Sequence, residues 1–257
     1  MKNLLNYFIL FLALLLPSLA QSKPANRIIS LDLCSDWMLV KYAQPSQILA
    51  LSSYIKQYPV DWVDLSQPTH NGSLEQLLAL KPDLVLVGEY NATLLRQRLI
   101  ELGIRVEILP LPRSLADIGS YEQKFLSLVG LPQHLASKAI ASNTTLPYNK
   151  RSRLLLIGAN GIGTGKATFE DELIERAGWR NYLTDDGYIR LDLEQLISDP
   201  PDALLWTAPQ STALANLFAK HPALNHVIAK DQWLKTDHWR WECPGPWTWT
   251  LIEQLKQ

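Results

Sequence analysis

Short, largely apolar runs recur along the chain and alternate with segments whose apolar residues have helical spacing. Runs of this length, bounded by turn residues, predict strands that are buried on both faces. The strongest runs are residues 27–31, 48–51, 84–87, 106–109, 154–157 and 203–206. Helices are expected up to residue 42 and over residues 93–102, 114–129, 132–146, 168–177 and 211–220, with a further strand near residue 227. The alternation of strand and helix predicts an α/β fold.

One phrase of the sequence occurs twice. SLEQLLALKPDLVLV, residues 73–87, returns as DLEQLISDPPDALLW, residues 192–206, with seven of fifteen positions identical. Ser73 and Asp192 open the two copies as helix caps, and each is followed three residues later by a Gln that can reach back to the amide of the cap. Pro-Asp then ends each helix before an apolar strand. The duplication indicates two related α/β lobes.

The length of 257 residues and the repeat together predict the division of the chain. We expect an N-terminal lobe over residues 27–112, a helical connector over residues 113–150 and a C-terminal lobe over residues 151–257. The second connector helix, residues 132–146, would span about 22 Å at ~1.5 Å per residue and join the lobes stiffly.

The first 20 residues have the pattern of a secretory signal peptide. Lys2 precedes an apolar centre at residues 8–16, and small residues at 18–20 form a cleavage site. The pattern predicts an exported protein in the periplasm, free of a lipid anchor because no Cys lies at the cleavage point. Net charge is 24 − 25 = −1, or 23 − 25 = −2 without Lys2, which argues against nucleic acid as a partner.

The chain has two cysteines, Cys34 and Cys243. An even number in a chain sent to an oxidising compartment favours a disulfide. Two thiolates that bind a soft metal are the alternative.

A glycine-rich segment, GANGIGTGK at residues 158–166, lies between a predicted strand and a predicted helix, where a phosphate-binding loop would lie. Asn160 occupies the place of the first required Gly, and Ala167 replaces the Ser or Thr that would hold magnesium. We therefore expect a flexible turn whose backbone amides line a cleft.

Four of the nine tryptophans fall within residues 239–249. Trp247 and Trp249, near the last predicted helix, suit a core. Trp239 and Trp241 flank Arg240 in a Pro/Gly-bounded loop, which favours a flat, apolar and partly anionic ligand because aromatic faces stack and Arg pairs with carboxylates.

Metal and catalytic chemistry have weaker support in the sequence. The five histidines are scattered, and a metal cage requires distant residues such as His70, Asp237 and His238 to converge. The chain contains neither a nucleophile elbow nor a paired-carboxylate motif. We therefore predict no catalytic residues, no resident metal and no enzyme activity.

Several features together resemble the periplasmic binding proteins of ABC importers for ferric siderophores, haem and cobalamin. They are the signal peptide, the start RIISLDLCSD, the L-E-Q-L-x-x-x-x-P-D-x-L unit in both halves, the helical connector and the C-terminal tryptophans. The resemblance covers residues 27–255. It implies two Rossmann-like lobes joined by a helical backbone, with the ligand held in a cleft between them. It also implies that Glu75 and Glu194 point toward Arg residues of a membrane permease, whereas the residues alone suggest only two solvated carboxylates at helix starts.

By the same resemblance, both lobes contribute to the ligand cleft. The residues implied are Cys34, Ser53, Tyr54, Asn71, Glu89, Tyr90, Asn160, Tyr188, Trp239, Arg240 and Trp241. The chain departs from the family pattern in a connector that ends early, at Pro147, and in the Cys34 and Cys243 pair, which either limits opening as a cross-lobe disulfide or meets the ligand as two thiols.

These observations predict a monomeric periplasmic receptor that needs no cofactor. It would bind a metal chelate, a corrinoid, haem or ferric siderophore, and deliver it to an ABC importer permease. The alternatives are a receptor for a bare divalent metal and an exported α/β enzyme.

Overall fold

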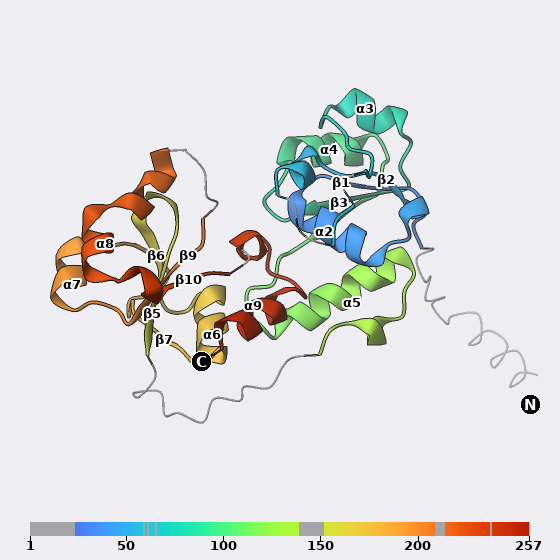
Figure 1. Ribbon diagram of the computed structural model, residues 1–257. Helices are drawn as coiled ribbons and strands as arrows, with labels where there is room; N and C mark the ends of the chain where they lie inside the picture. The colour runs from blue at the N-terminus through green and yellow to red at the C-terminus, as the bar shows by residue number, and fades with distance from the viewer. Residues whose placement is uncertain are drawn as a thin grey trace, which may run out of the picture.

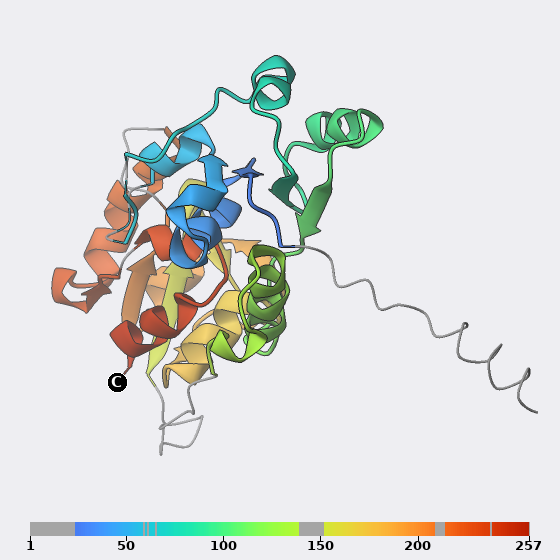
Figure 2. The same ribbon diagram turned by 90° about the vertical axis from the view of Figure 1, so that its right-hand side faces the viewer.

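The computed structural model describes residues 24–58, 60, 62–64, 66–138, 152–208, 214–236 and 238–256. The predicted signal peptide lies outside these residues. Figure 1 shows two α/β lobes side by side, with helices α5, α6 and α9 gathered beneath them, and Figure 2 shows the same three helices together from the N-terminal side.

The N-terminal lobe contains a parallel sheet in the order β2-β1-β3-β4. Its strands are β1 (Ile28–Ser30), β2 (Ile48–Ala50), β3 (Leu84–Gly88) and β4 (Val106–Leu109). Its α-helices are α2 (Leu33–Tyr42), α3 (Leu74–Ala79) and α4 (Thr93–Glu101), and its 3-10 helices are η1 (Pro45–Gln47) and η2 (Ser53–Lys56). The neighbours Ile28 and Ile29 are fully buried in different clusters on opposite faces of the sheet, which explains why an apolar run predicts this strand.

The C-terminal lobe contains a mixed sheet in the order β10-β9-β5-β6-β8, with β7 paired to the start of β5. Its strands are β5 (Arg153–Ile157), β6 (Ile162–Thr164), β7 (Arg180–Asn181), β8 (Tyr188–Arg190), β9 (Ala203–Trp206) and β10 (Trp233–Leu234). Its α-helices are α6 (Phe169–Arg176), α7 (Leu193–Ser198), α8 (Pro222–Val227) and α9 (Thr248–Leu255). Its 3-10 helices are η5 (Ala159–Gly161), η6 (Leu214–Lys220), η7 (Lys230–Gln232) and η8 (His238–Glu242).

Three local predictions in this lobe differ from the structure, although Gly158 and Ala159 line a hollow as expected. The strand expected near residue 227 is the end of α8, which starts at Pro222, a residue suited to the first helical position. The flexible turn expected at residues 158–165 contains the 3-10 helix η5 and the strand β6, which pairs with β5 and β8. The helix expected over residues 211–220 is the 3-10 helix η6 in its described part.

The repeated phrase forms the same unit in both lobes, a capped helix followed by an interior strand. Ser73 Oγ accepts from the amide of Gln76 at 3.3 Å, and Asp192 accepts from the amides of Glu194 and Gln195. The side chain of Gln76 does not reach the amide of Ser73 as predicted; it accepts instead from the amide of Asn71 at 2.7 Å. The strands that follow, β3 and β9, each lie between two parallel neighbours.

The helix that bridges the lobes is α5 (Asp117–Val129), not the second expected helix. Ile118, in the first turn of α5, packs in a C-terminal-lobe cluster, whereas Phe125 and Val129 pack in the main N-terminal-lobe cluster. Residues 132–138 contain only the short 3-10 helix η3 (Gln133–Leu135), and the rest of the expected second helix lies outside the described residues. One helix of about 20 Å therefore belongs to both cores.

The C-terminal tail crosses between the lobes a second time. Trp247 packs in the N-terminal core against Trp37 and Trp62, with ring centroids 5.1 and 5.8 Å away. Trp249 and Ile252 of α9 then pack in the C-terminal core against α6. The two lobes are joined by this tail as well as by α5.

Candidate ligand cleft

Two hollows lie next to each other, one lined mainly by each lobe. The N-terminal hollow has a volume of about 600 Å³ and the C-terminal hollow about 320 Å³. The N-terminal hollow is lined by Leu31, Asp32, Leu33, Cys34, Tyr54, Tyr58, His70, Gly72, Tyr90, Asn91, Ala92, Leu95, Glu242 and Cys243. The C-terminal hollow is lined by Gly158, Ala159, Ile162, Thr164, Glu170, Tyr188, Thr207, Ala208, Trp241 and Glu242. Because Glu242 lines both, the two hollows adjoin and are described together as one cleft.

The N-terminal wall is built where parallel strands end. In open α/β sheets, ligands bind at the carboxyl ends of the strands, where the loops leave the sheet. Asp32 follows β1 and accepts hydrogen bonds from the amide of Ser35 at 3.1 Å, the Ser35 hydroxyl at 2.9 Å and the amide of Gly88 at 2.6 Å. This carboxylate caps α2 and ties the end of β1 to the end of β3, so it holds the wall rigid.

Tyrosines line both hollows. Tyr54, Tyr90 and Tyr188 are 52%, 74% and 65% exposed, so their rings and hydroxyls are accessible to a ligand. The Tyr188 hydroxyl donates to Glu170 at 3.2 Å, and burial together with the charge of Glu170 raises the pKa of Tyr188 to about 12. Burial and the nearby Glu242 raise the pKa of Tyr58. The phenols of Tyr58 and Tyr188 therefore stay protonated.

Two carboxyl groups complete the cleft. Burial raises the pKa of Glu170 on the C-terminal side and of Glu242 at the junction of the hollows. The Glu242 side chain is nevertheless open to the cleft. Both carboxylates are incompletely hydrated and favour a ligand that supplies hydrogen-bond donors or positive charge.

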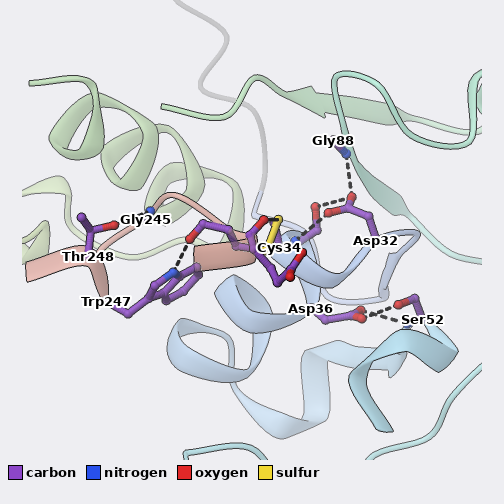
Figure 3. The surroundings of a disulfide bond; sticks show 11 residues. Asp32, Cys34, Asp36, Ser52, Gly88, Gly245, Trp247 and Thr248 are labelled. Carbon is purple, nitrogen blue, oxygen red and sulfur yellow. Dashed lines mark hydrogen bonds between the residues drawn. A yellow bond between two sulfur atoms is a disulfide. The ribbon is translucent and has the colours of Figure 1, made fainter. Parts of the chain in front are cut away.

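The disulfide favoured by the sequence is present and forms part of the N-terminal wall (Figure 3). Cys34 lies in the first turn of α2 and Cys243 directly after η8, with their Cα atoms 5.3 Å apart. The indole nitrogen of Trp247 donates to the carbonyl oxygen of Cys243. Because both sulfur atoms are in the bond, neither cysteine is a thiolate ligand in this structure.

The structure brings only some of the implied cleft residues together. Those that line a hollow are Cys34, Tyr54, Tyr90, Tyr188 and Trp241. Those that line neither hollow are Ser53, Asn71, Glu89, Asn160 and Arg240. The side chain of Trp239 lies outside the described residues.

Local interactions explain these departures. Asn71 accepts from the amide of Ser73 at 2.9 Å and so serves the start of α3, and Glu89 pairs with Arg113 at 3.1 Å. Arg240 is 9% exposed, and its guanidinium lies 4.7 Å from the centre of the Trp62 ring. The expectation that Arg240 pairs with ligand carboxylates is therefore not supported.

Sequence reasoning missed Tyr58, Asn91, Glu170 and Glu242 as cleft residues. Glu242 could have been suspected from its place between Trp241 and Cys243, both candidates themselves. Glu170 lies in the first turn of α6, two residues after the cap Thr168, and only the fold turns it toward the cleft.

His70 is a structural residue. It is 4% exposed, its Nε2 lies 2.7 Å from the carbonyl oxygen of Ser30, and its Nδ1 accepts from the amide of Gly72 at 3.0 Å. Burial lowers its pKa, so it is neutral with both ring nitrogens engaged. No group of three His, Cys, Asp or Glu in the described part of the chain is arranged to hold a metal ion, and Asp237 and the His238 side chain lie outside that part.

Glu75 and Glu194 lie in the first turns of α3 and α7, one in each lobe (Figure 1). Both side chains are exposed, and neither makes a hydrogen bond or ion pair with another described residue. Among the described residues, no helix is long and apolar enough to span a membrane.

Comparison with known proteins agrees with this geometry. The sequence matches the family model described as periplasmic binding protein over residues 28–232. No curated protein matches the sequence. A solved periplasmic haem-binding protein of Pseudomonas aeruginosa is 22% identical, with a TM-score of 0.66 over 90% of this chain and 91% of that chain. The haem-binding protein HutB of Vibrio cholerae is 18% identical, with a TM-score of 0.68 over 89% and 95% of the two chains.

The vitamin B12-binding protein BtuF of Vibrio cholerae is 20% identical, with a TM-score of 0.59 over 90% of this chain and 95% of that chain. At such identities the likeness shows a shared fold of two α/β lobes. The family match, by contrast, covers most of the chain. The protein therefore belongs to the periplasmic binding protein family, whose members bind solutes and are not enzymes.

Proposed function

We propose that the protein captures a metal chelate, a corrinoid, haem or ferric siderophore, and delivers it to the permease of an ABC importer. One observation carries the proposal: two aromatic hollows, one from each lobe, meet at Glu242. Their volumes of about 600 and 320 Å³ suit an organic ligand, since small-molecule pockets typically measure ~300–1,000 Å³. Any bound chelate is cargo and not a cofactor.

A bare divalent metal is a less suitable cargo. Such an ion needs several His or carboxylate ligands at about 2.0–2.2 Å. Among the described residues, His70 is the histidine that lines the cleft, and it uses both ring nitrogens within the protein.

The absorption spectrum of protein purified from its native periplasm tests the ligand class. Corrinoids, haem and ferric catecholates absorb at different visible wavelengths, so a copurified chelate is identified directly. A protein free of chromophore that also fails to bind each of these chelates would contradict the proposal. Recovery of a chain that lacks residues 1–20, measured by mass, would establish export.

Docking to the permease is proposed to use Glu75 and Glu194. Each is exposed at the start of the repeated helix of its lobe, so the pair presents matching negative charges. We expect Glu75→Arg combined with Glu194→Arg to abolish chelate uptake while the Kd of the purified protein stays unchanged, because neither residue lines a hollow.

The control for this experiment is Glu101→Arg with Glu253→Arg, which makes the same change in net charge at exposed sites elsewhere. The control should transport normally. Unimpaired uptake in the Glu75 and Glu194 variant would refute the docking assignment and leave the ligand proposal intact.

A further inference from the structure

The cleft has a strongly unbalanced charge. Its lining contains the carboxyl groups of Asp32, Glu170 and Glu242. Among the described residues, neither hollow is lined by a Lys or Arg. The ligand therefore meets acidic and phenolic groups without a cation to balance a negative charge.

Two cations near the cleft have partners within the protein. Arg240, the neighbour of Trp241, is buried with its guanidinium over the Trp62 ring. Arg113 donates to Glu89 at 3.1 Å and to the Tyr90 hydroxyl at 3.2 Å, so its charge at the rim is already matched by Glu89. Lys56 lies between Tyr54 and Tyr58 in the sequence and is exposed, but it lines neither hollow.

The three cleft carboxyl groups differ in their freedom to act on a ligand. Asp32 is satisfied by three protein donors, and Glu170 accepts from Tyr188. Glu242 is open to solvent at the junction of the hollows. Partial burial raises its pKa, so its charged form carries a desolvation cost although part of the side chain reaches solvent. A donor or a positive charge on the ligand relieves this cost, and a ligand anion increases it.

We propose that the cargo is a metal chelate without net negative charge, an uncharged or cationic complex rich in amide or hydroxamate groups, and that Glu242 sets this preference. The inference rests on the proposed function and narrows its ligand class. Amide N–H groups would donate to Glu242, the phenols would donate to carbonyl oxygens, and the aromatic faces would cover the apolar part of the chelate.

Four probes test this preference on the mature protein by calorimetry or tryptophan fluorescence. Cyanocobalamin is uncharged and the ferric complex of desferrioxamine B is cationic, whereas haemin carries carboxylates and ferric enterobactin is trianionic. We expect one of the first two to bind at least about tenfold more tightly than both anionic probes, the size of effect that one partly buried charge produces.

Each outcome of the panel is decisive. Tightest binding of haemin or ferric enterobactin, or affinities equal within that factor, would overturn the charge preference and retain the chelate receptor. Binding of none of the four probes would overturn the proposed function together with the inference drawn from it.

Variants of Glu242 test the residue itself. Glu242→Lys should weaken binding of the preferred probe at least about tenfold and strengthen binding of haemin. The affinities of Glu242→Gln should lie between those of this variant and wild type. Glu253→Lys, at an exposed α9 position that lines neither hollow, is the matched control. Circular dichroism verifies that the variants fold. If the Lys variant does not fold, the Gln variant still tests the residue, because Gln keeps the shape of the Glu side chain. An unchanged ratio of affinities in the folded variants would refute the role of Glu242.

Discussion

Asp36 shows how a single residue ties the stability of the N-terminal lobe to pH. Its side chain is fully buried and receives a hydrogen bond from the Ser30 hydroxyl. It also accepts from the Ser52 hydroxyl and, at 2.8 Å, from the Ser52 amide (Figure 3). Burial raises the pKa of Asp36 to about 8, and these hydrogen bonds limit the rise. The folded state therefore binds a proton more tightly than the unfolded chain, in which an Asp titrates near its ordinary pKa of about 3.9.

The sign of the pH effect follows from this difference. Between pH 4 and 8 the folded protein holds the proton and the unfolded chain does not, so Asp36 lowers the free energy of unfolding as pH rises. We expect Asp36→Asn, which keeps the shape of the side chain without its titration, to gain about 3 to 4 kcal/mol in free energy of unfolding relative to wild type between pH 5 and pH 8. Urea unfolding at the two pH values measures the change.

Asp64→Asn is the control for the Asp36 measurement. Asp64 is exposed, and hydrogen bonds from Ser66 lower its pKa, so its titration lies below the tested range. Parallel pH profiles for wild type and Asp36→Asn would show that the three hydrogen bonds outweigh burial and keep Asp36 ionised.

The interactions of individual side chains were predictable where their partners are close in sequence. The caps Ser73 and Asp192 bond to amides two or three residues away, so the local pattern was sufficient. Arg240 was not predictable, because its partner Trp62 lies in the other half of the sequence and meets it only after the tail crosses between lobes. Glu242 became a cleft residue through the same crossing.

At the scale of elements, β6 explains the glycine-rich segment. A Cβ at Gly163 would overlap with the Leu183 side chain, and one at Gly165 with the carbonyl oxygen of Asp185. Glycines at every second residue therefore allow the neighbouring chain to approach one face of the strand. The period of two was visible in the sequence, but the turn-forming character of glycine hid the strand.

The same substitution at two glycines should have opposite effects. Gly165→Ala should lower the free energy of unfolding by about 1 to 3 kcal/mol, because the new methyl group meets rigid backbone. Gly119→Ala, in α5 with no atom near the added Cβ, should raise it by about 0.5 to 1 kcal/mol through helix propensity. Urea unfolding measures both, and a Gly165→Ala variant as stable as wild type would contradict the packing of β6.

Strands buried on both faces were predicted well and short elements were not. The runs that form β1, β3, β5 and β9 are continuous because each strand contacts helices on two sides. Two-residue strands such as β10 carry no pattern of their own and exist only through pairing with a neighbour. The bridging helix was misassigned for a related reason: both connector segments have helical spacing, and only the packing shows that α5 joins the cores.

In the described part of the chain, helix α5 and the C-terminal tail both connect the lobes. Helix α5 has one end in each core, and the disulfide anchors the C-terminal tail to α2. A bond between residues 209 positions apart restricts the unfolded chain strongly. Loop entropy gives about 5 kcal/mol as an upper figure for such a loop, and removal of native disulfides typically costs about 2 to 5 kcal/mol.

Cys34→Ser combined with Cys243→Ser should therefore lower the free energy of unfolding by about 2 to 4 kcal/mol, with a matching loss in Tm. Urea and thermal unfolding measure the change, and wild type treated with a reductant should approach the variant. Equal stability of oxidised wild type and variant would show that the bond adds nothing to the fold.

The position of Trp247 has a consequence for how the polypeptide assembles. This indole belongs to the N-terminal core yet stands eleven residues from the end of the 257-residue chain, counting itself. A chain truncated before Trp247 would leave the interior of the first lobe unfilled. Such a product would be a ready substrate for proteolysis.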